Sequence, residues 1–70
     1  MNRKEDITLA ERYEREAGEN ERKAKEAEKF LGRYGKEDQR LSRIYIEAIM
    51  NAARLAQRLA ELYRSRTQQD

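Results

Sequence analysis

Residues 41–63 constrain the fold more than any other part of the chain, because they hold most of its large apolar side chains at helical spacing. These apolar residues fall into two sets that lie about 100° apart around a helix. The first seam comprises Leu41, Tyr45, Ala48, Ala52, Leu55, Leu59 and Leu62. The second seam comprises Ile46, Ile49, Ala53, Ala56, Ala60 and Tyr63. A helix with two apolar seams needs more than one partner to cover it.

The preceding part of the chain offers one narrow apolar stripe, which can cover only one of these seams. Its members recur at alternating spacings of three and four: Ala10, Tyr13, Ala17, Asn20, Ala24, Ala27, Leu31 and Tyr34. This pattern predicts a long helix over about 7–33. Thr8 and Glu11 have the spacing of a capping box, which marks a helix start.

Glycines predict the position of the turn and one position where the first helix could break. Gly32 and Gly35 predict a turn over about 32–37, with one of them in the left-handed conformation that ends many helices. A second helix is then predicted over about 37–66, and a connection this short makes the two helices antiparallel neighbours. Gly18 lies close to Asn20, and a break of the first helix at these residues is the alternative. The chain would then form three helices. The heptad phase continues across these residues and favours one helix.

The fold predicted is all-α, a single helical-hairpin domain over residues 1–70. A chain this short rarely forms a sufficient core without a disulfide, a metal or a second subunit. With no Cys and no His, the first two supports are absent from this sequence. The uncovered seam therefore predicts a homodimer in which two hairpins form a four-helix bundle with coiled-coil packing. The sequence leaves open which seam forms the hairpin and which the dimer.

The same inventory argues against catalysis and cofactors. Without His or Cys, the usual nucleophiles, general bases and metal ligands are missing, and the sequence has no glycine-rich phosphate loop. We therefore expect a protein that is not an enzyme and has no cofactor and no metal. No apolar run approaches the length of a membrane span, and no signal-peptide core follows the start. The expected location is the cytoplasm, away from membranes.

Arginines give the clearest functional signal. Residues 39–66 carry six Arg against two Glu, whereas acidic and basic residues balance in residues 1–35. Guanidinium groups bind carboxylates and phosphates with two hydrogen bonds. Ile46 and Met50 flank the second seam and are the candidates for exposed apolar contact. The predicted partner-binding residues are Arg40, Arg43, Ile46, Met50, Arg54 and Arg58. An acidic protein surface is one predicted partner of these arginines, and a nucleic-acid backbone is another. The third possibility is that the arginines pair with the Glu-rich first helix of the same chain.

The segment Glu61-Leu62-Tyr63-Arg64-Ser65 resembles the end of the second helix of the Rop family of plasmid copy-number regulators. The start is loosely similar in Met1, Arg3, Glu5, Leu9, Arg12 and Tyr13. The resemblance implies a helical hairpin that dimerises into a four-helix bundle and binds paired RNA loops. RNA contacts would then fall to Arg3 and Tyr13. In outline the chain also looks like the small helical antiactivators of quorum-sensing regulators, without a shared motif.

Together these features predict a small non-enzymatic regulator. As a homodimer it would bind a larger protein through its helical surface and inhibit it. An RNA-binding regulator of the Rop kind is the alternative hypothesis. A structural assembly component is the third.

Overall fold

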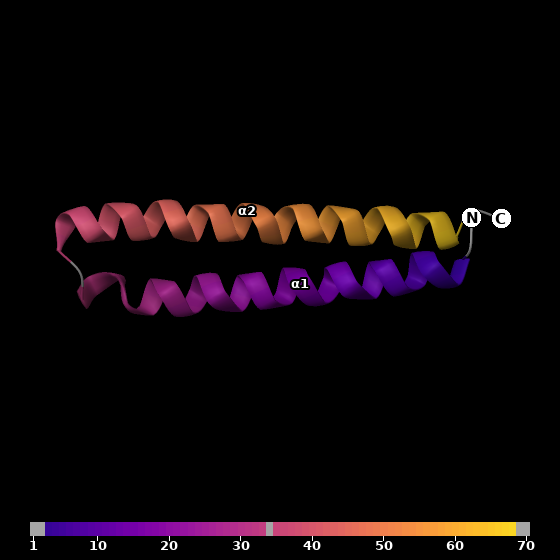
Figure 1. Ribbon diagram of the computed structural model, residues 1–70, viewed down its shortest axis with the longest axis horizontal. Helices are drawn as coiled ribbons and strands as arrows, with labels where there is room; N and C mark the ends of the chain where they lie inside the picture. Colours follow the sequence, from indigo (N-terminus) through magenta and orange to yellow (C-terminus); the bar gives the residue numbers. More distant parts are fainter. Residues whose placement is uncertain (1–2, 34, 69–70) are drawn as a thin grey trace.

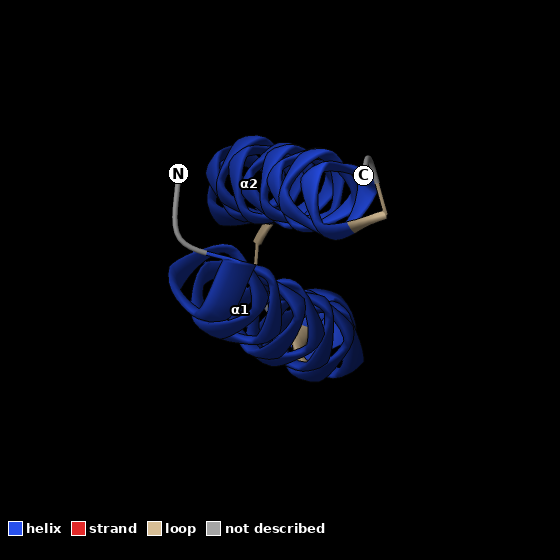
Figure 2. Ribbon diagram, turned by 90° about the vertical axis from the view of Figure 1, so that its right-hand side faces the viewer, coloured by secondary structure: helices blue, strands red, loops and turns tan. Residues whose placement is uncertain are grey.

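The computed structural model describes residues 3–33 and 35–68, and these form a helical hairpin. Helix α1 spans Arg3–Lys29, a 3-10 turn η1 spans Leu31–Arg33, and helix α2 spans Lys36–Thr67. The two long helices run antiparallel along their whole length (Figure 1). Viewed from the end, they lie side by side as two cylinders in one layer (Figure 2). The predicted all-α hairpin is confirmed.

Helix α1 begins earlier than the capping-box pattern predicts. Thr8 lies inside the helix, where its Oγ1 donates a hydrogen bond to the Lys4 carbonyl at 2.9 Å instead of capping the start. Glu5 and Asp6 occupy the first turn, where a negative charge is favourable beside the positive end of the helix dipole. This favourable charge explains how helical structure extends to Arg3.

The turn differs from its prediction in conformation as well as position. Helix α1 ends at Lys29, and a hydrogen bond of 3.0 Å from the Arg33 N–H to the Phe30 carbonyl tightens the chain into the 3-10 turn. Gly35 has φ −66° and ψ 168°, an extended conformation that places it at the N-terminal cap of α2. Neither Gly32 nor Gly35 has a positive φ, so the predicted left-handed glycine is wrong. Tyr34, predicted to end the first stripe, lies outside the described residues.

Gly18 does not break α1, which is continuous from Arg3 to Lys29. The alternative of three helices is therefore wrong, and the heptad phase is the better guide. Gly18 is exposed, and a Cβ added there would meet no atom within 4 Å.

Replacing Gly18 with alanine is expected to stabilise the hairpin. Alanine fits the helical conformation without a clash and reduces the conformational entropy of the unfolded chain, a gain of about 0.4–1 kcal/mol. Urea unfolding followed by circular dichroism measures this gain. Gly35→Ala is the control: Gly35 is also open to a Cβ but lies outside the helices, so helix propensity should add nothing there. A destabilised Gly18→Ala protein would contradict the continuous helix.

The buried core between the helices consists mostly of small side chains. The buried apolar residues are Ala10, Ala17, Ala24, Ile46, Ala53, Ala56 and Ala60. Those on α2 belong to the second seam, so the structure assigns the second seam to the hairpin. Among residues 3–33 and 35–68, no large side chain is completely buried. Alanine brings the helix axes close together but buries little apolar area per turn.

The hairpin is also far from compact. It measures 54 × 14 × 12 Å, and its radius of gyration is 16.0 Å. A compact domain of this length would have a radius of gyration of about 11 Å. The accessible surface is 5835 Å², whereas a compact protein of this mass exposes about 4,600 Å². The helices therefore present long faces to solvent.

Candidate binding surface

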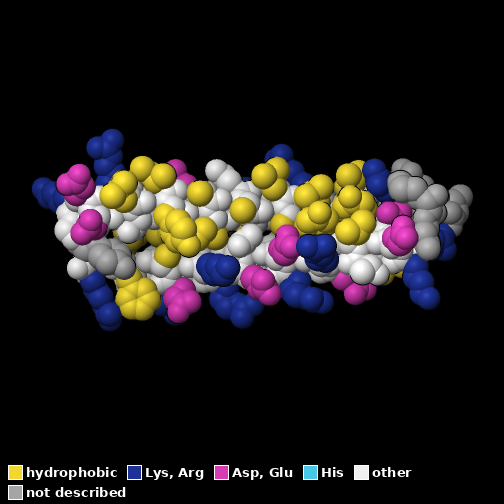
Figure 3. All heavy atoms as spheres, viewed as in Figure 1, with side chains coloured by type: hydrophobic (Ala, Val, Ile, Leu, Met, Phe, Trp, Pro, Cys, Tyr) yellow, Lys and Arg dark blue, Asp and Glu magenta, His cyan; other side chains and the backbone are white. Residues whose placement is uncertain are grey.

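The first seam is exposed along its whole length, and we call its surface the Leu-rich face. It comprises Leu41, Ile44, Tyr45, Ala48, Ala52, Leu55, Leu59 and Leu62. Leu41 and Tyr45 are each 61% exposed, and Leu55 is 60% exposed. On the side shown in Figure 3, hydrophobic side chains gather along α2, whereas α1 shows mainly charged ones. An apolar stripe this long on one helix is typical of a surface that another helix covers.

Ile44 belongs to this surface although it is missing from the predicted seams. It is 57% exposed. The signal was available in the sequence, because Ile44 lies three residues after Leu41 and four before Ala48, which is the spacing of one helix face. Phe30, 38% exposed at the end of α1, is a second large apolar residue that the prediction did not use.

The predicted arginines lie on α2 beside the Leu-rich face, in two separate groups. Arg40 and Arg43 line one shallow hollow together with Ile44. Arg54 and Arg58 line another with Leu55. The structure therefore brings each pair together but does not unite the four arginines in one site.

These arginines differ in their side-chain contacts. Arg54 donates a hydrogen bond from Nη1 to Asn51 Oδ1 at 3.0 Å, which fixes its direction. With the residues that the structure describes, Arg40, Arg43 and Arg58 make no hydrogen bond or ion pair. Their guanidinium groups point into solvent, where a carboxylate of another molecule can reach them. Exposed guanidinium groups bind anions but supply no acid–base chemistry, because they stay protonated.

Ile46 is a wrong prediction as an exposed contact residue. It is 6% exposed and buried between the helices, because the second seam faces α1. Met50 is half-buried and lines a groove with Glu28 and Glu47. The sequence could not predict which of these residues is buried, because either seam of α2 could pack against α1.

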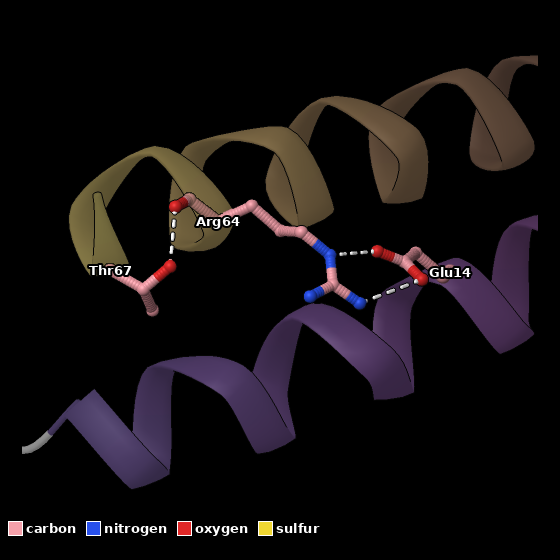
Figure 4. Close-up of polar contacts among 3 residues, drawn as sticks. All are labelled: Glu14, Arg64 and Thr67. Carbon is pink, nitrogen blue, oxygen red and sulfur yellow. Dashed lines mark hydrogen bonds and ion pairs between the residues drawn. The ribbon is translucent and has the colours of Figure 1, made fainter.

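One arginine does pair with the acidic first helix. Arg64 donates to the Glu14 carboxylate through Nε at 2.5 Å and through Nη2 at 3.2 Å, joining α2 to α1 (Figure 4). Thr67 lies in the next turn and donates its hydroxyl to the Arg64 carbonyl at 2.7 Å. The hydrogen bond from Arg64 lowers the pKa of Glu14 below its ordinary value of 4.5. Neutralisation by the first helix is thus confirmed for Arg64.

The lowered pKa of Glu14 makes a small part of the stability pH-dependent. A carboxylate whose pKa is lower in the folded state stabilises the fold above its ordinary pKa, and this contribution is lost as the pH falls through the folded value. We therefore expect the Glu14 contribution to be present at pH 7 and to disappear below about pH 4.5.

Thermal unfolding of the wild type and of Glu14→Gln at several pH values measures this contribution. The two proteins should differ at pH 7 and converge once the pH falls below the lowered pKa of Glu14. Because both side chains are more than two-fifths exposed, the difference should shrink at 1 M salt. Glu21→Gln, a change of the same kind at an exposed position of α1, is the control. A difference that persists at low pH would show that Glu14 acts other than as a carboxylate.

Two of the tyrosines, Tyr13 and Tyr63, pack against each other between the helices. Tyr13 is half-buried, and its ring stacks on that of Tyr63 with the centroids 5.9 Å apart and the planes 7° from parallel. Tyr13, to which the Rop-like resemblance assigns an RNA contact, therefore packs against Tyr63 within the hairpin. Arg3, the other residue assigned by the resemblance, is exposed.

Other kinds of site have little support in this structure. Within residues 3–33 and 35–68, no cluster of three or more acidic residues is placed to hold a metal ion. In the same ranges, neither long helix has a stretch apolar enough to cross a bilayer. Comparison with protein-family models, curated proteins and solved structures finds no match to this chain. The exposed faces of α2 are therefore the candidate binding surface.

Proposed function

We propose that the protein is a small regulator that acts as a homodimer, in which two hairpins form a four-helix bundle. The observation that carries this proposal is the Leu-rich face, which exposes four leucines, an isoleucine and a tyrosine on one side of α2. Leaving such a stripe in water is unfavourable by about 25 cal/mol per Å² of apolar surface. A second copy offers the same stripe and covers it by an isologous contact.

The thin core of the hairpin supports the same proposal. Six of the seven buried apolar residues are alanine, which contribute little area to the hydrophobic effect. A compact protein of twice this mass would expose only about 7,700 Å², far less than two separate hairpins of 5835 Å² each. Closing the four-helix bundle therefore buries as much surface as obligate dimers commonly do.

The regulatory part of the proposal rests on the arginines. Arg54 and Arg58 lie beside the Leu-rich face with their charges in solvent. Paired guanidinium groups next to apolar surface suit an acidic protein segment, which they recognise through bidentate hydrogen bonds. We propose that the dimer binds such a segment of a larger protein and inhibits it by covering it, without chemical change.

Two measurements test the proposed function. Light scattering at micromolar concentration should give twice the mass of one chain, and a folded monomer would overturn the dimer. Capture from the native cell should recover a partner with the wild type but not with Arg54→Glu/Arg58→Glu. Lys25→Glu/Lys29→Glu on α1 is the matched control, with the same spacing and charge change at exposed positions. Equal recovery by all three proteins would show that the arginines are not the site.

A further inference from the structure

The buried residues show which parts of α1 and α2 lie level with one another. Ala10, Ala17 and Ala24 of α1 are spaced by seven, as are Ile46, Ala53 and Ala60 of α2. In an antiparallel hairpin this spacing places Ala10 level with Ala60 and Ala17 level with Ala53. The start of α1 and the end of α2 also lie together, as Figure 1 shows. By the same count, Asn20 of α1 lies level with Met50 of α2.

Six of the eight residues of the Leu-rich face are palindromic in side-chain size about Met50, and Ile44 and Leu62 fall outside this pattern. The large residues at either end and the small residues in the middle repeat in reverse order: Leu41, Tyr45 and Ala48, then Ala52, Leu55 and Leu59. An isologous contact between antiparallel helices has this symmetry, because each residue meets the one at the mirrored position. Two helices that cross at about 20° are closest at the crossing point and diverge beyond it. Alanines at the centre and leucines toward the ends fit that shape.

We infer that the second copy docks antiparallel on the Leu-rich face, with a two-fold axis that passes between Met50 and Asn51 of α2 and between Glu19 and Asn20 of α1. This inference rests on the proposed homodimer and specifies its orientation and register. Helix α2 lies on the partner's α2, and α1 on the partner's α1. Leu41 then meets the partner's Leu59, and Tyr45 meets the partner's Leu55.

The exposed flank of α1 fits the same axis. Glu14, which reaches Arg64, marks the side of α1 away from the Leu-rich face. The opposite flank carries four residues at intervals of seven: Leu9, Glu16, Lys23 and Phe30. An axis between Glu19 and Asn20 places Glu16 opposite the partner's Lys23, and Leu9 opposite the partner's Phe30. Opposite charges meet in the middle and apolar side chains at both ends.

The outer row of charges on α2 also favours the antiparallel orientation. Arg40, Glu47, Arg54 and Glu61 alternate in sign at intervals of seven. About the same axis, Arg40 lies level with the partner's Glu61, and Glu47 with the partner's Arg54. In a parallel dimer each of these charges would lie level with its own copy. Such exposed charges determine orientation more than affinity.

The remaining arrangement places α2 on the partner's α1. This would set the Leu-rich face against the flank that carries Glu16 and Lys23, so that leucines would bury charged side chains. Desolvating charged side chains costs several kcal/mol, which disfavours it. Only α2 on α2 covers apolar surface with apolar surface.

Distances between spin labels in the intact protein test the inference. The chain has no Cys, so a single cysteine at Lys36, Asn51 or Ser65 carries one label per copy at an exposed position. With a rise of 1.5 Å per residue, the copies of Asn51 lie within about 3 Å of each other along the helix axis, and those of Ser65 about 43 Å apart. Lys36 should give the same separation as Ser65, because the two lie equally far from the axis.

Each outcome supports or overturns a distinct claim. Pulsed electron resonance should give a short distance for Asn51 and two long, equal distances for Lys36 and Ser65. Short distances at all three positions would show parallel α2 helices, which overturns the inference but keeps the dimer. Unequal distances at Lys36 and Ser65 would move the axis and overturn the register. No coupling at any position would mean a monomer, in which case the proposed function fails as well. Circular dichroism of each labelled protein confirms that it remains helical.

Discussion

Leu55→Ala/Leu59→Ala is expected to weaken self-association about a thousandfold. Leu55 is 60% exposed and Leu59 36% exposed, so neither contributes much to the contact between α1 and α2. In the proposed dimer the two copies lose four leucine side chains from the interface. Each loses about 1 kcal/mol of burial, and about 4 kcal/mol in total corresponds to roughly three orders of magnitude in Kd. Sedimentation equilibrium over a range of concentrations measures the change.

The matched control is Arg22→Ala/Glu26→Ala on α1, with the same spacing. These residues lie outside the Leu-rich face and are exposed. They are replaced by alanine, as the leucines are, and their helix propensities are similar to that of leucine. The control should associate as the wild type does. If the leucine variant keeps its Kd, another surface forms the dimer and the proposed role of the Leu-rich face is wrong.

The second large effect concerns the contact inside the hairpin. Ala53 is 2% exposed and lies in the line of alanines that joins the helices. A leucine at this position adds three carbon atoms where the helices are closest and forces them apart, at a cost of about 1–3 kcal/mol. Ala53→Leu should therefore lower the midpoint of urea unfolding, although leucine is a good helix former.

Gln57→Leu separates this steric effect from added hydrophobicity. Gln57 is exposed one turn further along α2, so leucine there meets no close neighbour from α1. The control should unfold at or above the wild-type midpoint. Equal stability of Ala53→Leu and the wild type would mean that the helices separate without cost, which contradicts a close alanine contact.

Periodicity predicted the helices well because their spacing depends on local chemistry. The heptad of alanines identified the face of α1 that packs, and it correctly carried the helix across Gly18. The ends were less accurate. Thr8 had the spacing of a capping residue, but the helix extends past it, and Gly35 adopts an extended conformation instead of the predicted left-handed one. Helix ends depend on a few weak interactions of similar size, which a sequence pattern does not rank.

The candidate surface was harder to predict for a different reason. The two seams of α2 are equally regular, and only packing decides which of them faces α1. The structure places the second seam, with its smaller side chains, against the alanines of α1. This choice buries Ile46, which the sequence offered as an exposed contact, and exposes Leu55 and Ile44. The positions of Arg54 and Arg58 beside the exposed seam follow from the same choice.

The alanine contact between α1 and α2 has a consequence for protein abundance. A hairpin with so little buried area has a small margin against unfolding on its own, so in the proposed dimer folding and association are coupled. The folded fraction then rises with the total amount of protein. At low expression the chain spends more time unfolded, where proteases degrade it. Such a regulator would act above a threshold concentration and be cleared quickly below it.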